Sequence, residues 1–341
     1  MPAERRPLRG ALIGVGGVAR QSHHPAYTLA PGVARLLQLV VSVDGAPVPD
    51  IPGLPRVRDA AGLAAFEPIE FVDVCTPTAS HVELVLWALE RGWHVLCEKP
   101  VATTRADAER VADAARRAGR VVVPCHQYRF NPAWLKLREW LDAGRIGRWH
   151  LAEFRTYRLH ADPGAVTGAG DAPWRGTRAA GGGGVLLDHG THLLYLLDDV
   201  AGRPARVHAW TGRLRHLAYD VEDTAQLLLE YPGDRIATIF VTWAGTAREN
   251  VIRFVGDRGT IGWVGGALTL DADDGQERVD FTAALDKAAY KDWFARLFGA
   301  FADAMERGDA EPWLREIGAV ADVLERAYAA AEAGAAPAGV P

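Results

Sequence analysis

The sequence predicts an α/β protein in which a doubly wound parallel sheet is followed by an α+β domain with an open, mostly antiparallel sheet. Three observations support this prediction. Short apolar runs alternate with helical patterns over residues 10–125, a glycine-rich turn follows the first run, and the later apolar runs follow one another without helices between them. With 341 residues, the chain also fits two domains of common size better than one core.

The first part of the chain contains five apolar runs with the length of buried parallel strands, over 11–14, 37–43, 71–75, 93–97 and 121–125. Apolar residues recur at helical spacing over 80–91, where Ser80 and Glu83 have the spacing of a capping box and Gly92 is a stop. A second helix is expected over 104–118. Strands and helices in this alternation form right-handed βαβ units, so we predict a first domain over residues 1–125.

The three cysteines Cys75, Cys97 and Cys125 each end one of these runs. They form no CxxC pair and are odd in number, so neither a disulfide framework nor a cysteine-rich metal site is favoured. We expect three buried thiols at the carboxyl ends of parallel strands. We predict no metal site, and we expect His23, His24 and His216 to be structural or exposed.

After residue 125 the pattern changes. An amphipathic helix is expected over 134–141, and short strands follow over 150–157, 206–211, 225–231, 236–243 and 251–255. No helical pattern separates most of these strands, which favours an antiparallel sheet. We predict a second domain over 126–334, which ends with an alanine-rich helix over 313–334. Packing of this last helix back on the first domain is the alternative to packing within the second. Residues 335–341 are expected to be a weakly ordered tail.

The overall charge of the chain limits which kinds of partner molecule are expected. Lysine and arginine number 38 against 43 acidic residues, which gives a net charge of −5, and no long basic run occurs. This argues against nucleic acid as a partner. The sequence has no apolar run of the roughly 18 residues that a membrane span needs. The apolar stretch after Arg9 leads into a glycine-rich turn, so we interpret it as a strand and expect a cytoplasmic protein.

The glycine-rich turn after the first run has the pattern GxGxxA over 14–19. The first glycine permits a tight turn, the second lets the backbone approach a pyrophosphate, and the small last residue lets helix and strand pack closely. The expected cofactor-binding residues are Gly14, Gly16, Gly17 and Val18. Asp44, after the second strand, can accept hydrogen bonds from ribose hydroxyls and repel a 2′-phosphate, so NAD is favoured over NADP. The alternatives are a glycine turn without ligand and a turn-forming Asp-Gly pair.

A segment that is apolar almost all round, 185–197, follows a run of glycines and contains an aspartate and a histidine of interest. Asp188 and His192 are four residues apart and share one face of a helix. Burying both without partners is costly, so they meet each other, water or a ligand. Lys99 follows the strand that ends at Cys97, where open α/β sheets place their ligands. The alternatives are a satisfied core pair and a solvated loop lysine.

Taken together, three stretches resemble the glucose-fructose oxidoreductase, inositol dehydrogenase and rhizopine-catabolism (Gfo/Idh/MocA) family. They are residues 75–81, the Glu98-Lys99-Pro100 sequence, and the glycines 182–184 that lead to Asp188 and His192. The resemblance spans nearly the whole chain and is specific for the family but not for a substrate. It implies a Rossmann domain, an α/β substrate domain, and hydride transfer between NAD and a sugar, cyclitol or nucleotide-linked sugar.

The resemblance also implies roles for individual residues. The catalytic positions are Lys99, Asp188 and His192. The positions that line the cofactor are Thr76, Pro77, His81 and Glu98, and those that touch substrate are Tyr128, Arg129 and Asn131. Many members of the family carry an acid three residues after the catalytic histidine, whereas this chain has Tyr195.

The chemistry expected from these residues is general acid–base assistance to hydride transfer. His192 takes the proton from the substrate hydroxyl or returns it, Asp188 orients His192 or binds a neighbouring hydroxyl, and Lys99 lowers the pKa of the hydroxyl. Arg175, preceded by Trp174, is a candidate to grip a phosphate, carboxylate or sugar hydroxyl, with a surface or packing role as the alternative.

Two other functions remain open at this point. A redox-neutral, NAD-dependent glycoside hydrolase uses the same cofactor, and a non-catalytic nucleotide-sensing regulator uses the same fold. The set Lys99, Asp188 and His192 favours the dehydrogenase. Because open sheets often bury one face by self-association, we expect a homodimer or homotetramer.

Overall fold

The chain divides into two compact units in the computed structural model, which describes residues 6–30, 33–40, 56–57, 63, 69–161, 174–285 and 289–334. The first unit contains the described residues up to Gln127 and the segment from the helix at residue 290 to Gly318. The second contains the described residues from Tyr128 to 285 and those from Ala319 onward. The predicted division after residue 125 stays a prediction, and each unit is described below by itself.

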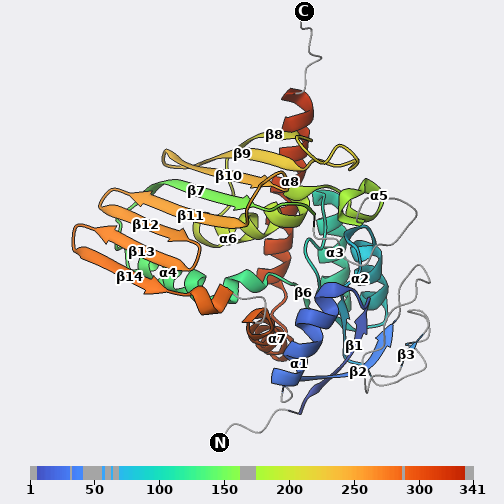
Figure 1. Cartoon of the computed structure of the whole chain (residues 1–341). Helices are drawn as coiled ribbons and strands as arrows, with labels where there is room; N and C mark the ends of the chain where they lie inside the picture. Colours follow the sequence, from blue (N-terminus) through green and yellow to red (C-terminus); the bar gives the residue numbers. More distant parts are fainter. Residues whose placement is uncertain are drawn as a thin grey trace, which may run out of the picture. The chain divides into compact units, whose positions relative to one another are not determined.

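The first unit is built on a six-stranded parallel sheet with the strand order β3-β2-β1-β4-β5-β6 (Figure 1). The order reverses between β1 and β4, which is the arrangement of a doubly wound Rossmann sheet and confirms the predicted fold class. The strands are β1 (Leu8–Ile13), β2 (Ala34–Val40), β3 (Arg56–Val57), β4 (Phe71–Val74), β5 (His94–Cys97) and β6 (Val122–Pro124).

The crossover helices of this sheet lie where the periodicity predicts them, as α2 (His81–Glu90) and α3 (Arg105–Ala118). The capping box at the start of α2 was a wrong prediction. The Ser80 Oγ lies 2.8 Å from the carbonyl oxygen of Pro77 and 2.7 Å from Oγ1 of Thr76, so it closes the preceding short helix η3 (Thr78–Ser80) and does not cap α2. At α3 the Thr104 hydroxyl accepts from the Asp107 amide at 3.1 Å, which makes Thr104 the cap.

The glycine-rich turn opens a helical run made of a π-helical segment, η1 (Ala19–His23), and α1 (His24–Leu29). Helix α7 (Tyr290–Arg307), which was not predicted, packs against α1. Its Phe298 stacks on Tyr27 with ring centroids 4.1 Å apart, and its Phe301 meets Phe71 of β4 edge-on at 5.4 Å. An aromatic layer thus joins α1 and α7 to the sheet.

The three cysteines occupy the predicted positions at the carboxyl ends of β4, β5 and β6. All three are buried free thiols. Burial raises the pKa of each thiol well above its usual range, so they stay protonated. The prediction that they are small core residues is confirmed.

The second unit is built on an eight-stranded sheet with the order β14-β13-β12-β11-β7-β10-β9-β8. Neighbouring strands are antiparallel except for the parallel pair β10 and β7, so the predicted mostly antiparallel sheet is confirmed. The strands are β7 (Trp149–Tyr157), β8 (Arg206–Gly212), β9 (Thr224–Tyr231), β10 (Arg235–Thr242), β11 (Glu249–Gly256), β12 (Gly259–Val264), β13 (Ala267–Ala272) and β14 (Gly275–Asp280).

One face of this sheet carries the core of the second unit. Phe154 and Phe254 pack there with Trp134 and Trp140 of α4 (Pro132–Asp142) and with the apolar residues of α6 (Thr191–Ala201). The remaining helices are η4 (Gln127–Phe130), η5 (Trp174–Gly176), α5 (Arg178–Gly181), η6 (Leu186–Gly190), η7 (Thr282–Leu285) and α8 (Glu311–Gly334). Within the described ranges, no helix combines the length and the apolar character that crossing a membrane requires.

The imidazole of His94 gives the first unit a pH-dependent stability. Burial, together with the charge of Arg120, lowers the pKa of His94 to about 4, and its Nδ1 accepts from the Val121 amide at 3.1 Å. In the unfolded chain the pKa is about 6.5, so between these values the unfolded state binds more protons and acid destabilises the fold.

We therefore expect His94→Asn, whose side-chain oxygen can replace Nδ1 as acceptor, to reduce this sensitivity. Between about pH 7 and pH 5 the unmodified chain should lose about 1 kcal/mol more stability than the variant, after allowance for solvent screening. Urea unfolding followed by circular dichroism at both pH values measures the difference. His160→Asn, at an exposed position, is the control. Equal losses in the His94→Asn variant and the unmodified chain would contradict the assignment.

Candidate functional site

The glycine-rich turn begins directly after β1 and has no room for a side chain at its first position. Gly14 has a φ of +87°, and a Cβ there would lie 2.9 Å from the carbonyl of Cys75 and 2.9 Å from Cγ2 of Thr76. Such contacts are too short for any other residue. The ends of β1 and β4 therefore approach closely because position 14 is glycine.

The next two glycines of the turn face open space. A Cβ built on Gly16 or Gly17 meets no described atom within 4 Å. The helical run starts here, and the Gly16 carbonyl accepts from the Arg20 amide at 3.2 Å. Open backbone at the first turn of a helix beside the switch point of the sheet fits a dinucleotide pyrophosphate. Val18 lies in the same turn, whereas Asp44 lies outside the described residues.

The loops after β4 and β5 are joined by His81. Its Nδ1 is 2.8 Å from the Pro100 carbonyl and its Nε2 is 2.9 Å from the Thr76 carbonyl. The ring is buried, and burial lowers its pKa. Thr76 and Pro77 lie on the first of these loops, and Lys99 lies on the second, before a cis peptide bond to Pro100. His81 thus has a structural function in fixing both loops.

A buried polar cluster that was not predicted lies beneath these loops. His23 of η1 lies between Asp73 of β4 and Glu98 at the end of β5, with its ring nitrogens 2.8 and 2.9 Å from their carboxylate oxygens. The sequence carried one signal, because Asp73 interrupts an apolar strand and a buried carboxylate needs a partner. Its partner is 50 residues away in the chain.

His23, Asp73 and Cys125 also offer ligand atoms within 4.8 Å of one another. The Nδ1 of His23 is paired with Asp73 and its Nε2 with Glu98, so both ring nitrogens already have a partner within the protein.

In the second unit, a glycine run leads into η6 and α6 and is fixed by Glu222. The buried carboxylate of Glu222 accepts from the amides of Gly184 and Leu186 and from the hydroxyl of Tyr328. A Cβ on Gly184 would lie 1.9 Å from the Glu222 carbonyl oxygen. The start of the helical segment that carries Asp188 and His192 is thus held by a carboxylate, and burial raises the pKa of Glu222.

The imidazole of His192 is enclosed by two tyrosines. Its Nδ1 is 2.9 Å from the Tyr195 hydroxyl, and its ring stacks on Tyr128 with centroids 4.2 Å apart and an interplanar angle of 10°. The Tyr195 hydroxyl also accepts from the backbone amide of Tyr128 at 3.2 Å. The structure therefore brings together His192, the predicted substrate residue Tyr128, and Tyr195, which stands where many members of the family carry an acid.

Asp188 lies in η6, close to the predicted arginine. Its Oδ2 is 3.5 Å from Nε of Arg175, whose guanidinium lies 4.3 Å over the Trp174 ring. Asp188, Arg175 and Trp174 thus form a second group in this unit. Lys99 belongs to the first unit, whereas Asp188 and His192 belong to the second.

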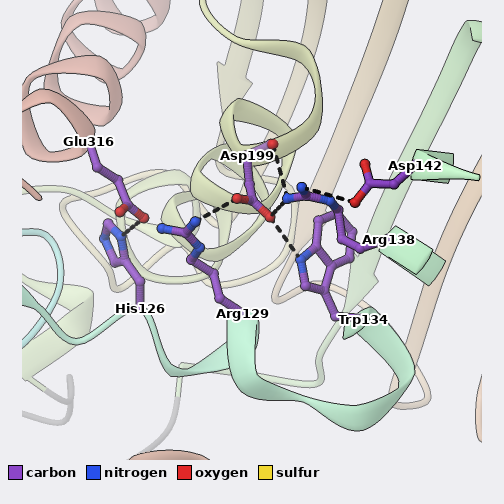
Figure 2. A network of polar contacts seen from close by, with 7 residues as sticks. All are labelled: His126, Arg129, Trp134, Arg138, Asp142, Asp199 and Glu316. Carbon is purple, nitrogen blue, oxygen red and sulfur yellow. Dashed lines mark hydrogen bonds and ion pairs between the residues drawn. The ribbon is translucent and has the colours of Figure 1, made fainter. Parts of the chain in front are cut away.

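The other residues predicted to touch substrate have partners within the protein. Arg129 donates to Asp199 at 2.5 Å, and Trp134 and Arg138 also donate to that carboxylate (Figure 2). The side chain of Asn131 accepts from the Ala133 amide at 2.9 Å and caps α4. Figure 2 also shows the buried His126 and Glu316 of the first unit, which are 2.6 Å apart.

Comparison with known proteins agrees with this geometry. The family model described as an oxidoreductase family with an NAD-binding Rossmann fold matches residues 8–126, and the model of the GFO/IDH/MocA C-terminal domain matches residues 134–262. The D-glucoside 3-dehydrogenase of Escherichia coli (strain K12) is 31% identical over 280 residues, which cover 74% of this chain and 76% of that protein.

Two solved structures share the fold over nearly the whole chain. An inositol dehydrogenase homolog from Azotobacter vinelandii, complexed with NAD+, has a TM-score of 0.81 and 23% identity, and the match covers 97% of both chains. A levoglucosan dehydrogenase in complex with NADH and levoglucosan has a TM-score of 0.80 and 21% identity, over 96% of this chain and 98% of that one. At these identities the likeness concerns the fold alone.

Proposed function

Because the chain belongs to the Gfo/Idh/MocA family of oxidoreductases, we propose that it transfers a hydride between NAD and a hydroxyl-bearing carbon of a sugar, cyclitol or nucleotide-linked sugar. The observation that carries this proposal is the open backbone at Gly16 and Gly17, placed at the switch point of a parallel sheet. The D-glucoside 3-dehydrogenase relative supports a sugar-like substrate.

NAD, when bound, supplies or accepts the hydride at its nicotinamide ring. In this proposal the protein's part is to manage the substrate oxygen. The ammonium of Lys99 hydrogen-bonds that oxygen and stabilises the negative charge that develops on it. His192 takes the hydroxyl proton during oxidation and returns it during reduction.

In this proposal Tyr195 orients the ring of His192. The sequence suggests Asp188 either for that role or for binding a neighbouring substrate hydroxyl. The Tyr195 hydroxyl is the group at Nδ1 of His192, and it is itself fixed by the Tyr128 amide. Asp188, paired with Arg175, is then available for a neighbouring substrate hydroxyl. Partners that orient a catalytic group in this way typically matter by one to two orders of magnitude.

We expect Tyr195→Phe to lower kcat about tenfold or more while KM changes little, because the ring of His192 keeps its stacking on Tyr128 but loses the contact at Nδ1. Steady-state kinetics with the best substrate measure both constants. Tyr157→Phe, on β7 of the second unit, is the matched control and should behave like the unmodified chain. An unchanged kcat in Tyr195→Phe would remove the orienting role.

The cofactor site is tested separately by Gly16→Val. A Cβ at this position meets no described atom within 4 Å, so we expect the melting temperature to change little. We expect the Kd for NAD to rise by at least about tenfold, because the backbone can no longer approach the pyrophosphate. Titration calorimetry with NAD measures this. Binding as tight as in the unmodified chain would place the dinucleotide elsewhere.

The substrate class is tested with a panel of polyols, free sugars and nucleotide sugars, assayed by nicotinamide absorbance with NAD and with NADP. Net production of NADH with a sugar supports the dehydrogenase. Cleavage of aryl glycosides without net NADH identifies the redox-neutral hydrolase. A stable protein partner with no turnover on the panel identifies the regulator, and faster turnover with NADP contradicts the preference that we assign to Asp44.

We also propose that the chain is a cytoplasmic homodimer or homotetramer. The second sheet has exposed apolar side chains at Trp210, Ile236 and Val264, which supports self-association. The three free thiols support a reducing compartment. Analytical ultracentrifugation tests the oligomeric state, and a monomer at micromolar concentration contradicts the proposed dimer or tetramer.

A further inference from the structure

The first unit's polar cluster contains a fully buried imidazole, that of His23, which the chemistry proposed above does not use. The side chains of His23 and Asp73 are 0% exposed and that of Glu98 is 10% exposed. The Nδ1 of His23 is 2.8 Å from Oδ2 of Asp73, and its Nε2 is 2.9 Å from Oε1 of Glu98. One ring thus bridges two carboxylates that come from different strands.

This geometry determines the protonation of the ring. An ionised carboxylate offers only lone pairs, so both ring nitrogens of His23 have to donate, which requires the imidazolium. Burial lowers the pKa of His23, but the charge and the hydrogen bond of Asp73, together with the contact to Cys75, raise it well above its usual range. Burial raises the pKa of Glu98, but the hydrogen bond and charge of His23, with Lys99, bring it below its usual range.

The other neighbours of the ring do not compete for the charge. The Tyr27 hydroxyl donates to Asp73 at 2.9 Å, and the Cys75 sulfur lies 3.3 Å from Nδ1 as a protonated thiol. Helix α7 contributes the apolar rings of Phe294 and Phe298, with centroids 4.2 and 6.0 Å from that of His23. An aromatic ring beside an imidazolium adds a favourable interaction.

The cluster continues to the residue that is proposed to act on substrate. The second oxygen of Glu98 accepts from the backbone amide of Lys99 at 3.1 Å. Hydrogen bonds therefore run from His23 through Glu98 to the main chain of Lys99. One cation and two carboxylates leave the cluster with one negative charge, which complements the ammonium of Lys99.

We propose that His23 is a permanently charged positioning residue, whose imidazolium holds the carboxylate of Glu98 and, through it, the backbone of Lys99 beside the cofactor turn. This inference rests on the proposed function, since it gives Lys99 the role of acting on the substrate oxygen. His23 itself touches neither substrate nor cofactor. Its effect on turnover comes from the placement of the loop after β5.

The test compares two variants with a control. His23→Gln leaves two buried carboxylates without their cation, so we expect it to be strongly destabilised. The double variant His23→Gln with Asp73→Asn removes one of those charges and should recover most of the melting temperature. We expect its kcat to stay at least about tenfold low, with the Kd for NAD unchanged, because glutamine cannot hold Glu98 by charge. His24→Gln, the same change at the next residue, is the control.

A purely structural role predicts the opposite for the double variant, in which kcat would recover together with the melting temperature. That result would overturn the proposal. Nitrogen-15 NMR of histidine-labelled protein gives a second readout that is independent of activity. The signals of His23 are those that the unmodified chain shows and the double variant lacks. In the unmodified chain they should show both ring nitrogens protonated from about pH 6 to about pH 9. A neutral tautomer or a titration within this range would overturn the proposal, even if Lys99 proved dispensable for turnover.

Discussion

Replacing Lys99 with methionine is expected to lower kcat by about a thousandfold while NAD still binds with its normal affinity. Methionine has a similar length and volume but no ammonium, so the substrate oxygen loses the positive charge that stabilises its developing negative charge. Removing one such donor commonly costs two to three orders of magnitude in rate. The fold should tolerate the change, because the anchors of this loop are the Lys99 amide and the His81 ring.

Turnover and NAD titration, measured on the same preparation, separate the two effects. Lys136→Met is the matched control, since Lys136 forms a surface ion pair with Glu139 on α4 and such pairs contribute little. Near-normal turnover in Lys99→Met would show that another group stabilises the substrate oxygen. Loss of NAD binding together with turnover would instead assign Lys99 to the cofactor.

Replacing Gly184 with alanine is expected to cost about 3 kcal/mol of stability and most of the activity. The new Cβ would lie 1.9 Å from the carbonyl oxygen of Glu222 and 2.8 Å from its Cδ, so the backbone has to move. Movement breaks the hydrogen bonds from the amides of Gly184 and Leu186 to the Glu222 carboxylate. The segment that carries Asp188 and His192 then loses its fixed start.

Gly299→Ala is the control for this substitution. Gly299 lies inside α7, where a Cβ meets no described atom within 4 Å, so alanine should stabilise the helix by up to about 1 kcal/mol. Denaturant unfolding and kcat for both variants measure the contrast. A Gly184→Ala variant with normal stability and normal kcat would mean that the turn can open without disturbing the residues after it.

The elements with a clear hydrophobic period could be predicted from the sequence. The runs at 71–75 and 93–97 became β4 and β5, since short and mostly apolar segments of this length are typical of buried strands. Strand β12 was missed because Gly259 and Gly262 interrupt the alternation on which a strand prediction depends, and β14 was missed because most of its residues are polar. Their pairing comes from neighbours in the sheet, which a local pattern does not contain.

The candidate site divides in the same way. The pattern GxGxxA carries its own physical reason, so the turn at Gly14 was predictable to the residue. The partners of His23 and His192 were not predictable, since a hydrogen bond such as that between His23 and Glu98, 75 positions apart, depends on the finished fold. Asn131 gave a local signal that was overlooked, because asparagine before proline is a typical helix start.

The distribution of thiols gives the first unit a native reporter of its own. Cys75, Cys97 and Cys125 all lie at the carboxyl ends of its parallel strands, so a thiol-labelling reagent can modify them only when that sheet opens. Buried tryptophans lie in both units, with Trp93 and Trp293 in the first and Trp134 and Trp243 in the second, so tryptophan emission follows the whole chain. Labelling rates and emission recorded on one sample would therefore show whether the parallel sheet opens with the rest of this protein or before it.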